Sequence, residues 1–267
     1  MKASSSSERP YARTIDPRYA KRMTTIAIYS AKGGVGKTTL SVNLAWASAT
    51  RSSRKTLLWD LDAQAAATFI LATASPKASA REVIERALDP ADAIVPTATP
   101  GLDVLAADAS IRGLDVLFAQ LDKKKRLRKL MDDLAKRYDR ILLDCPPGLG
   151  DTSDQVIRAA DLIVMPIIPS TLSRRAYEEV RDHLGHQHKG ATPILPVFSM
   201  ADRRRSAHLA ALAAEPDWPV IPMASAAEQM ADRHAAIGTY APRSPVTTAV
   251  TQLWTVIERR LASSKKG

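Results

Sequence analysis

The chain has 267 residues, 45% of them hydrophobic and 5% aromatic, with 38 Lys and Arg against 28 Asp and Glu for a formal net charge of +10. This composition can bury an aliphatic core, and the single cysteine, Cys145, excludes an internal disulfide. No apolar run reaches the roughly 20 residues that span a bilayer, and the excess positive charge favours polyanionic partners such as nucleic acid or an anionic membrane surface.

The pattern along the chain predicts strands of continuous apolar character alternating with amphipathic helices. Residues 1–22 are basic and polar, lack the apolar centre of a secretory signal, and are expected to form a flexible tail before a single domain at 23–267. We expect strands within 23–30, 55–62, 98–108, 139–148, 161–169, 192–200 and 218–223, and helices at 38–49, 113–138 and about 245–262. Such alternation indicates an α/β fold with a mostly parallel sheet flanked by helices on both faces.

The most informative stretch is "AKGGVGKTT", residues 31–39, between the first expected strand and helix. Glycines at 33, 34 and 36 let the backbone wrap around phosphate oxygens at a helix N-terminus, whose free N–H groups attract anions. In this pattern Lys37 contacts the β and γ phosphates and the Thr38 hydroxyl binds Mg²⁺. The loop also carries a second lysine, Lys32, that a nucleotide in one subunit does not require.

Carboxylates follow two of the expected strands. Asp60 and Asp62 end the strand "TLLWDLD", and Asp144 ends the strand "RILLD". Open parallel sheets bind ligands at the carboxyl ends of their strands. We therefore expect Asp144 to hold Mg²⁺ through its water shell, and one of Asp60 and Asp62 to orient the attacking water of a nucleotide hydrolase.

These motifs resemble those of the ParA/MinD group of deviant Walker A ATPases. The segment "KGGVGKTT" (32–39) is similar to their phosphate loop, "DLDAQ" (60–64) to switch I and "LLDCPPGLGD" (142–151) to switch II. Looser similarities continue at "DLIVMPIIPSTLS" (161–173), "SMADRRR" (199–205) and "IGTYAPRSP" (237–245). The resemblance runs from about Met23 to the last helix and implies a single-domain P-loop NTPase that binds ATP and Mg²⁺.

The resemblance also implies roles for individual residues. Lys32 matches the signature lysine that reaches the partner's phosphates when two ATP-bound subunits pack face to face, and with Lys37 and Asp62 it would serve catalysis. Asp62 matches the aspartate that positions the hydrolytic water. The metal site would comprise Thr38, Asp60 and Asp144. The nucleotide would contact Lys32, Gly33, Gly34, Val35, Gly36, Lys37, Thr38 and Thr39.

Two surfaces distinguish the branches of this family, since ParA-like members bind DNA nonspecifically and MinD-like members bind membrane through an amphipathic C-terminal helix. The stripe Leu253, Trp254, Ile257 and Leu261 is expected to dock on the core, so no stable membrane anchor is expected. Arg203, Arg204 and Arg205 are the expected DNA contacts, with Arg204 the best match to a ParA arginine. The basic run 123–129 and the pair Arg174 and Arg175 are further candidate DNA contacts, and the alternative for each is a helix face that meets only solvent.

The sequence thus predicts a cytoplasmic, nucleoid-associated ATPase that forms a homodimer around ATP and binds nonspecific DNA. A ParB-like or other adaptor protein would stimulate its weak intrinsic hydrolysis and release it, so that cycling positions a plasmid, a chromosome origin or a protein assembly. A MinD-like membrane-cycling regulator is the first alternative. A nucleotide-binding scaffold that does not hydrolyse ATP is the second.

Overall fold

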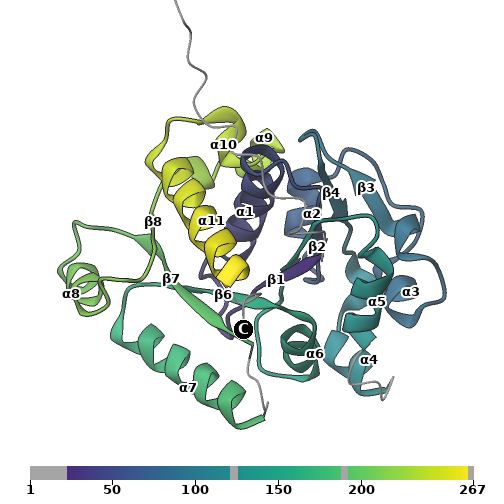
Figure 1. Cartoon of the computed structure of the whole chain (residues 1–267), viewed down its shortest axis with the longest axis horizontal. Coiled ribbons are helices and arrows are strands. Elements are labelled where there is room, and N and C mark those ends of the chain that lie inside the picture. Colours follow the sequence, from purple (N-terminus) through teal and green to yellow (C-terminus); the bar gives the residue numbers. More distant parts are fainter. Residues whose placement is uncertain (1–22, 121–125, 188–191, 264–267) are drawn as a thin grey trace, which may run out of the picture.

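The apolar segments of the sequence form one eight-stranded sheet in a computed structural model that describes residues 23–120, 126–187 and 192–263 (Figure 1). The strand order is β3-β4-β2-β5-β1-β6-β7-β8. All neighbours pair in parallel except β3 and β4, which are antiparallel. The strands are β1 (Thr24–Ile28), β2 (Thr56–Asp60), β3 (Ile94–Pro96), β4 (Leu102–Leu105), β5 (Arg140–Asp144), β6 (Leu162–Ile167), β7 (Ile194–Ala201) and β8 (Val220–Pro222).

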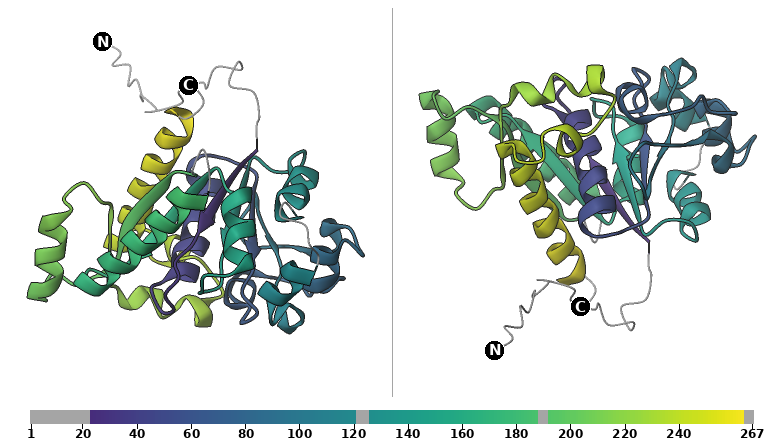
Figure 2. Two further views of the ribbon diagram at one scale, coloured as in Figure 1. Left: turned by 90° about the horizontal axis from the view of Figure 1, so that it is seen from below. Right: turned by 90° about the horizontal axis from the view of Figure 1, so that it is seen from above.

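Helices cover both faces of this sheet, as Figures 1 and 2 show. One apolar core lies between the sheet and α1 (Lys37–Arg51), α2 (Ala66–Leu71), α9 (Met230–Arg233), α10 (Ile237–Tyr240) and α11 (Pro245–Ser263). The other lies beneath α3 (Ala80–Glu85), α4 (Leu114–Gln120), α5 (Arg126–Leu134), α6 (Asp151–Ala159) and α7 (Thr171–Gln187). Helix α8 (Ser206–Ala214) lies at one end of the molecule, and the short 3₁₀ helices are η1 (Pro90–Ala93), η2 (Ala109–Ile111) and η3 (Ser225–Ala227). The expected α/β architecture is confirmed.

Burial on both faces explains why the strands read as continuous apolar runs. Every residue of β1, β2, β5 and β6 is buried, including the polar Thr24, Thr56 and Arg140. Parallel strands covered on both sides have no solvent-facing positions and therefore show no alternation. The edge strand β3 has only three residues and ends at Pro96, and this brevity explains why the sequence pattern did not reveal it.

The prediction of one helix at 113–138 is only partly confirmed. The structure describes α4 and α5 on either side of residues 121–125, which lie outside the described part of the chain together with the expected tail, 1–22. Helix α5 ends at Leu134, four residues early, yet Tyr138 is still buried and donates a hydrogen bond to Asp103 at 2.8 Å. The apolar period therefore continued past the helix because Tyr138 packs from the turn that leads into β5.

The last helix is docked, as expected from its apolar stripe. Leu253, Trp254, Ile257 and Leu261 are all buried in the core formed with α1 and β8. The Trp254 indole N–H donates to the Ser52 hydroxyl at 2.7 Å, which satisfies the ring's only polar atom. None of the helices in the described residues has the length and apolar character needed to cross a bilayer.

Removal of the Trp254 side chain should strongly destabilise the fold. We expect Trp254→Ala to lower the free energy of unfolding by about 3–5 kcal/mol, because it leaves a large cavity between α11 and α1. The exposed neighbour Thr255 offers a matched control, and Thr255→Ala should change stability by less than about 0.5 kcal/mol. Urea denaturation followed by circular dichroism measures both, and equal midpoints would contradict the docked position of α11.

Candidate functional site

The phosphate-loop sequence joins the carboxyl end of β1 to the start of α1, in the middle of the sheet. Gly34 and Gly36 have φ angles of +70° and +85°, and Gly36 is the residue that precedes the first turn of α1. Gly33 and Gly34 have no atom within 4 Å of where a Cβ would stand, so the loop faces open space. This is a helix N-terminus with accessible N–H groups, which is a ready-made site for an anion.

The two lysines of the loop occupy different environments. Lys37 is 7% exposed, and its Nζ donates to the backbone carbonyl of Lys32 at 2.9 Å. Burial lowers the pKa of Lys37, and the nearby Asp144 opposes that shift. The Lys32 side chain is exposed, and no ion pair holds it within the described residues. Lys37 thus serves the interior of the loop, while Lys32 is available to another molecule.

The remaining loop residues are fixed by contacts with neighbouring elements. The carbonyl of the buried Val35 accepts a hydrogen bond from the Ser199 hydroxyl of β7 at 2.8 Å. The Thr39 carbonyl accepts from Asn43 at 2.7 Å, and Asn43 in turn accepts from the backbone N–H of Ile237 at 2.8 Å. These bonds tie the loop and the start of α1 to β7 and to the first residue of α10.

Asp144 ends β5 beside the phosphate loop and is almost completely buried, at 1% exposed. Its Oδ1 accepts from the Ser41 hydroxyl at 2.9 Å, whereas Oδ2 has no hydrogen-bond partner in the described residues. Burial, with the charge of Asp60 second, raises the pKa of Asp144 to about 7, and the Thr38 and Ser41 hydroxyls oppose the shift. A buried carboxylate oxygen without a donor fits a hydrated cation, so these residues suit Mg²⁺.

Asp60 is fully buried at the end of β2, directly opposite Asp144 in the strand register. Its Oδ1 accepts from the backbone N–H of Asp62 at 3.1 Å, and its Oδ2 accepts from both the N–H and the hydroxyl of Thr68 at 2.9 Å. Burial raises the pKa of Asp60 to about 6, and these hydrogen bonds limit the rise. Both carboxylate oxygens of Asp60 therefore hold the segment that leads into α2. The carboxylate itself lies next to that of Asp144.

Asp62 lies in the turn that follows and is half-buried. Its Oδ1 accepts from the Gln64 backbone N–H at 2.9 Å, and its carbonyl accepts from Ala65, which adopts a left-handed φ of +53°. The side chain borders a cavity of about 180 Å³ between the turn and residues 145–150. Asp62, Asp144 and Lys37 interact electrostatically, so the structure brings these predicted residues together.

Sequence reasoning missed three contributors to this site. Ser41, one helical turn after Lys37, holds Asp144, and the spacing i and i+4 from the loop lysine could have revealed it. Tyr29 and Met200 gave no signal in the sequence. Met200, at a φ of +53°, approaches Gly36 and borders an apolar cavity of about 130 Å³ with Pro222, Met223 and Val246.

The predicted DNA contacts lie apart from this centre, in the turn between β7 and α8. Arg203, Arg204 and Arg205 are all exposed. Arg204 forms a two-pronged ion pair with Asp202, with both N···O distances at 2.9 Å. Asp202 therefore neutralises Arg204, whereas the other two arginines of the turn, Arg203 and Arg205, have no carboxylate partner among the described residues.

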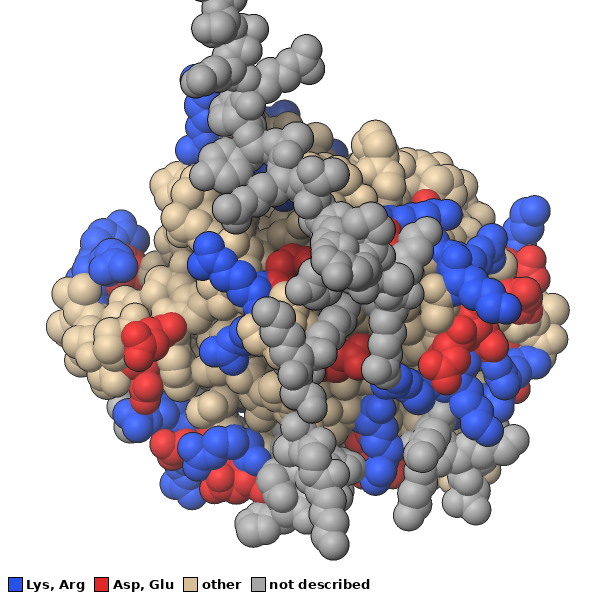
Figure 3. Space-filling model, viewed as in Figure 1, with Lys and Arg blue, Asp and Glu red and all other residues tan. Residues whose placement is uncertain are grey.

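Several of the other basic groups singled out in the sequence are engaged within the protein, whereas Lys129 is exposed and has no carboxylate partner among the described residues. Lys123, Lys124 and Lys125 lie outside the described residues, and Arg126 is buried with its Nε donating to the Ile84 carbonyl at 2.6 Å. Arg174 and Arg175 each pair with a glutamate one turn later on α7. On the face shown in Figure 3, Lys and Arg side chains lie interspersed with Asp and Glu. For Arg126, Arg174 and Arg175, the sequence thus overstates the free positive charge.

The parallel sheet, the glycine loop at a helix N-terminus, and the buried acid beside it define a P-loop nucleotide-binding protein. Comparisons with known proteins agree with this class. A family profile described as an AAA domain matches residues 23–190. The chromosome partitioning protein ParA of Caulobacter vibrioides is 30% identical over 196 residues, which cover 70% of this chain and 73% of that protein. The chain therefore belongs to the ParA/MinD family of P-loop ATPases.

Two further similarities support this assignment. The sporulation initiation inhibitor protein Soj of Bacillus subtilis is 34% identical over 145 residues, 53% of this chain and 57% of Soj, so that match spans little more than half of the relative. The structure of the septum site-determining protein MinD of Pyrococcus horikoshii, complexed with Mg-ADP, has a TM-score of 0.74 at 23% identity and covers 90% of this chain and 97% of MinD. This likeness shows that the two proteins share a fold.

The conformation of Gly36 should be a requirement of the loop. We expect Gly36→Ala to destabilise the protein by about 1–2 kcal/mol, because a side chain strains the left-handed backbone and would lie 3.3 Å from the Met200 methyl group. Gly33→Ala is the matched control, since Gly33 has open space around it and no positive φ. Thermal unfolding of the two variants without nucleotide tests this, and equal losses would contradict the loop geometry.

Proposed function

We propose that this chain is a ParA-like ATPase that binds ATP with Mg²⁺ and uses hydrolysis to switch between a DNA-bound dimer and a free state. The observation that carries the proposal is the unpartnered Oδ2 of the buried Asp144 beside the phosphate loop. Such an oxygen is costly unless a ligand satisfies it. The MinD structure, which is complexed with Mg-ADP, supports the same cofactors, and the relatives named for chromosome partitioning support the role.

Each loop residue has a role in binding the triphosphate. The backbone N–H groups of residues 33–39 would donate to phosphate oxygens, and the Lys37 ammonium would neutralise their charge. Thr38 and Asp144 would hold Mg²⁺, and Asp60 would add negative charge beside that site while it fixes the following turn. A bound Mg²⁺ neutralises the charge that develops on the transferred phosphoryl group. The apolar cavity beside Thr39 would receive the base.

Asp62 is the proposed residue for orienting the hydrolytic water. Its half-exposed carboxylate borders the cavity next to Asp144, and a hydrogen bond from Gln64 fixes one of its oxygens. The described residues of one chain place no arginine in the lining of that cavity to stabilise the transition state. We therefore propose slow intrinsic hydrolysis that an adaptor protein accelerates.

Dimerisation would complete the site. Lys32 is exposed at the rim of the loop and is proposed to reach the phosphates of a second subunit, where burial of a triphosphate between two chains requires additional cations. Because the apolar stripe of α11 is buried, that helix offers no apolar face to a membrane. This favours a DNA surface over the MinD-like membrane cycle.

The cellular role follows from these properties. The ATP dimer would bind nonspecific DNA of the nucleoid in the cytoplasm, and a ParB-like or other adaptor would trigger hydrolysis and release. Repeated cycles would position a plasmid, a chromosome origin or a protein assembly. The similarity to Soj and to Caulobacter ParA supports this role. Side-by-side binding of the ATP-loaded protein to nonspecific DNA and to anionic liposomes would separate it from the membrane alternative.

The two loop lysines should give separable defects. Lys37→Ala is expected to abolish measurable ATP binding. Lys32→Ala is expected to retain it but to weaken ATP-dependent dimerisation by about 2–5 kcal/mol, because a cation next to the partner's phosphates is lost. Equilibrium binding of a fluorescent ATP analogue and sedimentation with a slowly hydrolysed analogue measure the two effects.

Three outcomes would contradict parts of the proposal. Normal affinity in Lys37→Ala would refute the phosphate-loop assignment, and an unchanged dimer in Lys32→Ala would refute the role across the interface. ATP binding by the wild-type protein without any turnover, even with its adaptor, would favour the nonhydrolysing scaffold.

The DNA proposal can be tested at the turn before α8. Arg203→Glu with Arg205→Glu should weaken nonspecific DNA binding and lower the slope of log affinity against log salt by about 2, one unit for each phosphate contact. Arg204→Glu should have a smaller effect because Asp202 already neutralises Arg204.

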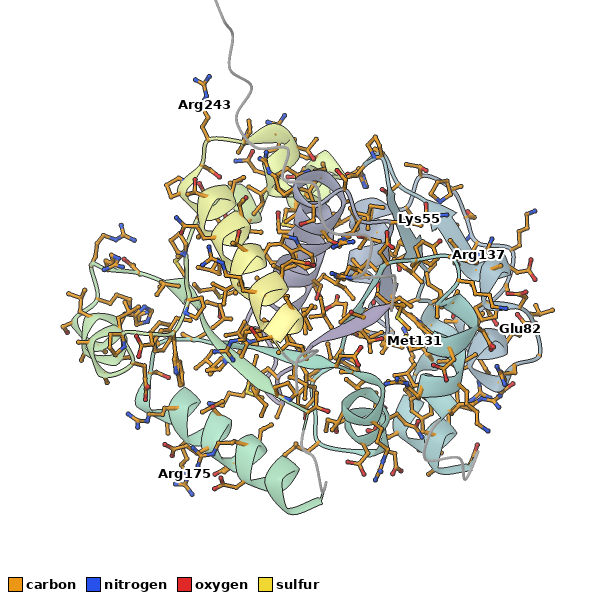
Figure 4. All side chains as sticks on the ribbon, viewed as in Figure 1. Lys55, Glu82, Met131, Arg137, Arg175 and Arg243 are labelled. Carbon is orange, nitrogen blue, oxygen red and sulfur yellow. The ribbon has the colours of Figure 1, made fainter. Side chains whose placement is uncertain are left out.

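A matched control carries the same change of charge at another place. Figure 4 shows Lys55 and Arg137 at the side of the molecule away from α8, and both are exposed. Lys55→Glu with Arg137→Glu should leave the salt slope unchanged. Equal losses in the two double variants would show a general charge effect and would overturn the assignment of Arg203 and Arg205.

A further inference from the structure

The segment that follows Asp144 is attached to the phosphate loop at one residue, Gly148. Its backbone N–H donates to the Ala31 carbonyl at 3.2 Å, and its carbonyl accepts from the Tyr29 hydroxyl at 2.7 Å. Tyr29 and Ala31 both lie between the end of β1 and the glycines of the loop. The start of the phosphate loop therefore holds the two polar backbone groups of Gly148 from both sides.

Tyr29 is built for this contact. Its ring is 2% exposed and packs in the core beneath α4–α6, and its backbone N–H is fixed by the Val164 carbonyl at 3.1 Å. Burial raises the pKa of Tyr29 to about 12, so the hydroxyl keeps its proton at neutral pH and remains a donor. A donor on a rigid ring gives the bond a fixed position relative to β1.

The segment it holds would otherwise have few constraints. Gly148 has a φ of +121°, and Leu149 next to it is 58% exposed. The chain is fixed again at Gly150, whose N–H donates to the Ser153 hydroxyl at 2.7 Å, and at the start of α6, where the Thr152 N–H donates to Asp115 Oδ1 at 2.8 Å. Between Asp144 and α6 the same cavity that borders Asp62 lies under residues 145–150, so there is room for this segment to shift.

We propose that Tyr29 is a positioning residue for hydrolysis, whose hydroxyl holds Gly148 and thereby aligns the segment after Asp144 with the phosphate loop. This inference rests on the proposed ATPase function. Tyr29 itself touches no phosphate or water in the reaction; it acts through Gly148. A segment held in this way keeps the Asp144 end of β5, the Asp62 turn and the loop in one geometry, and misplacement by about 1 Å can cost a large part of a rate.

The test compares two buried tyrosines whose hydroxyls donate hydrogen bonds at opposite ends of β5. Tyr29→Phe removes the hydroxyl that holds Gly148. Tyr138→Phe removes the hydroxyl of another buried tyrosine, which donates to Asp103 at 2.8 Å at the opposite end of β5. Both changes conserve the ring, so both variants should fold, and urea denaturation should show similar losses of stability.

The expected result is a split between turnover and binding. Tyr29→Phe should lower kcat for ATP by about tenfold and change the Kd of an ATP analogue by less than about twofold, whereas Tyr138→Phe should leave both at the wild-type value. Amide hydrogen exchange of the nucleotide-free protein should be at least about fivefold faster at Gly148 and Gly150, the hydrogen-bonded amides of this segment, in Tyr29→Phe alone.

The outcomes separate this inference from the function on which it rests. Equal kcat values in the two variants, or equal exchange at Gly148 and Gly150, would overturn the positioning role and leave Tyr29 as a packing residue. Absence of ATP turnover in the wild-type protein would refute the proposed function instead, and the exchange comparison would still decide whether Tyr29 holds the segment.

Discussion

The structure depends on a pair of carboxylates buried side by side at the ends of two central strands. Asp60 and Asp144 face each other in the register of β2 and β5, and burial raises the pKa of both. Two neighbouring acids in a low-dielectric place are tolerated only if donors and cations surround them. Asp60 satisfies this condition inside the protein, through Asp62 and Thr68, whereas Asp144 leaves one oxygen unpaired. The asymmetry makes one acid a structural anchor and leaves the other with an oxygen for the proposed Mg²⁺.

Most of the fold could be predicted because the residues that form it carry local signals. Seven of the eight described strands were expected, and the exception, β3, is too short and too close to the edge for an apolar run to form. The end of α5 was misplaced because Tyr138 keeps the helical period although its side chain packs from a turn. Periodicity reports burial, and a residue can be buried without being helical.

The site was predictable to a similar extent and for a different reason. Glycine and lysine spacing located the loop, and strand ends located the acids, because both are set by the backbone. Partners that come from distant segments gave no such signal, as when Tyr29 meets Gly148. Even a local pairing such as that of Asp202 with Arg204 depends on a turn that folds the carboxylate back on the arginine. Arg126 shows the same limit, since a residue of a basic run is buried on a backbone carbonyl. Charge counts in sequence therefore give the amount of charge and not its availability.

The amino and carboxyl ends of the strands differ in how firmly they are held, and this difference suits the proposed nucleotide switch. At the amino ends, Arg140 forms a two-pronged ion pair with Glu258 at 2.8 Å, and Trp254 donates a hydrogen bond to Ser52. At the carboxyl ends, the phosphate loop contains left-handed glycines, lies next to cavities, and is joined to the segments around it by single hydrogen bonds. In the proposed cycle, a change in the number of phosphates would act at the carboxyl ends of the strands, where few contacts must break. The structural response to the nucleotide would stay local because the amino ends of the strands, cross-linked through α11, resist deformation.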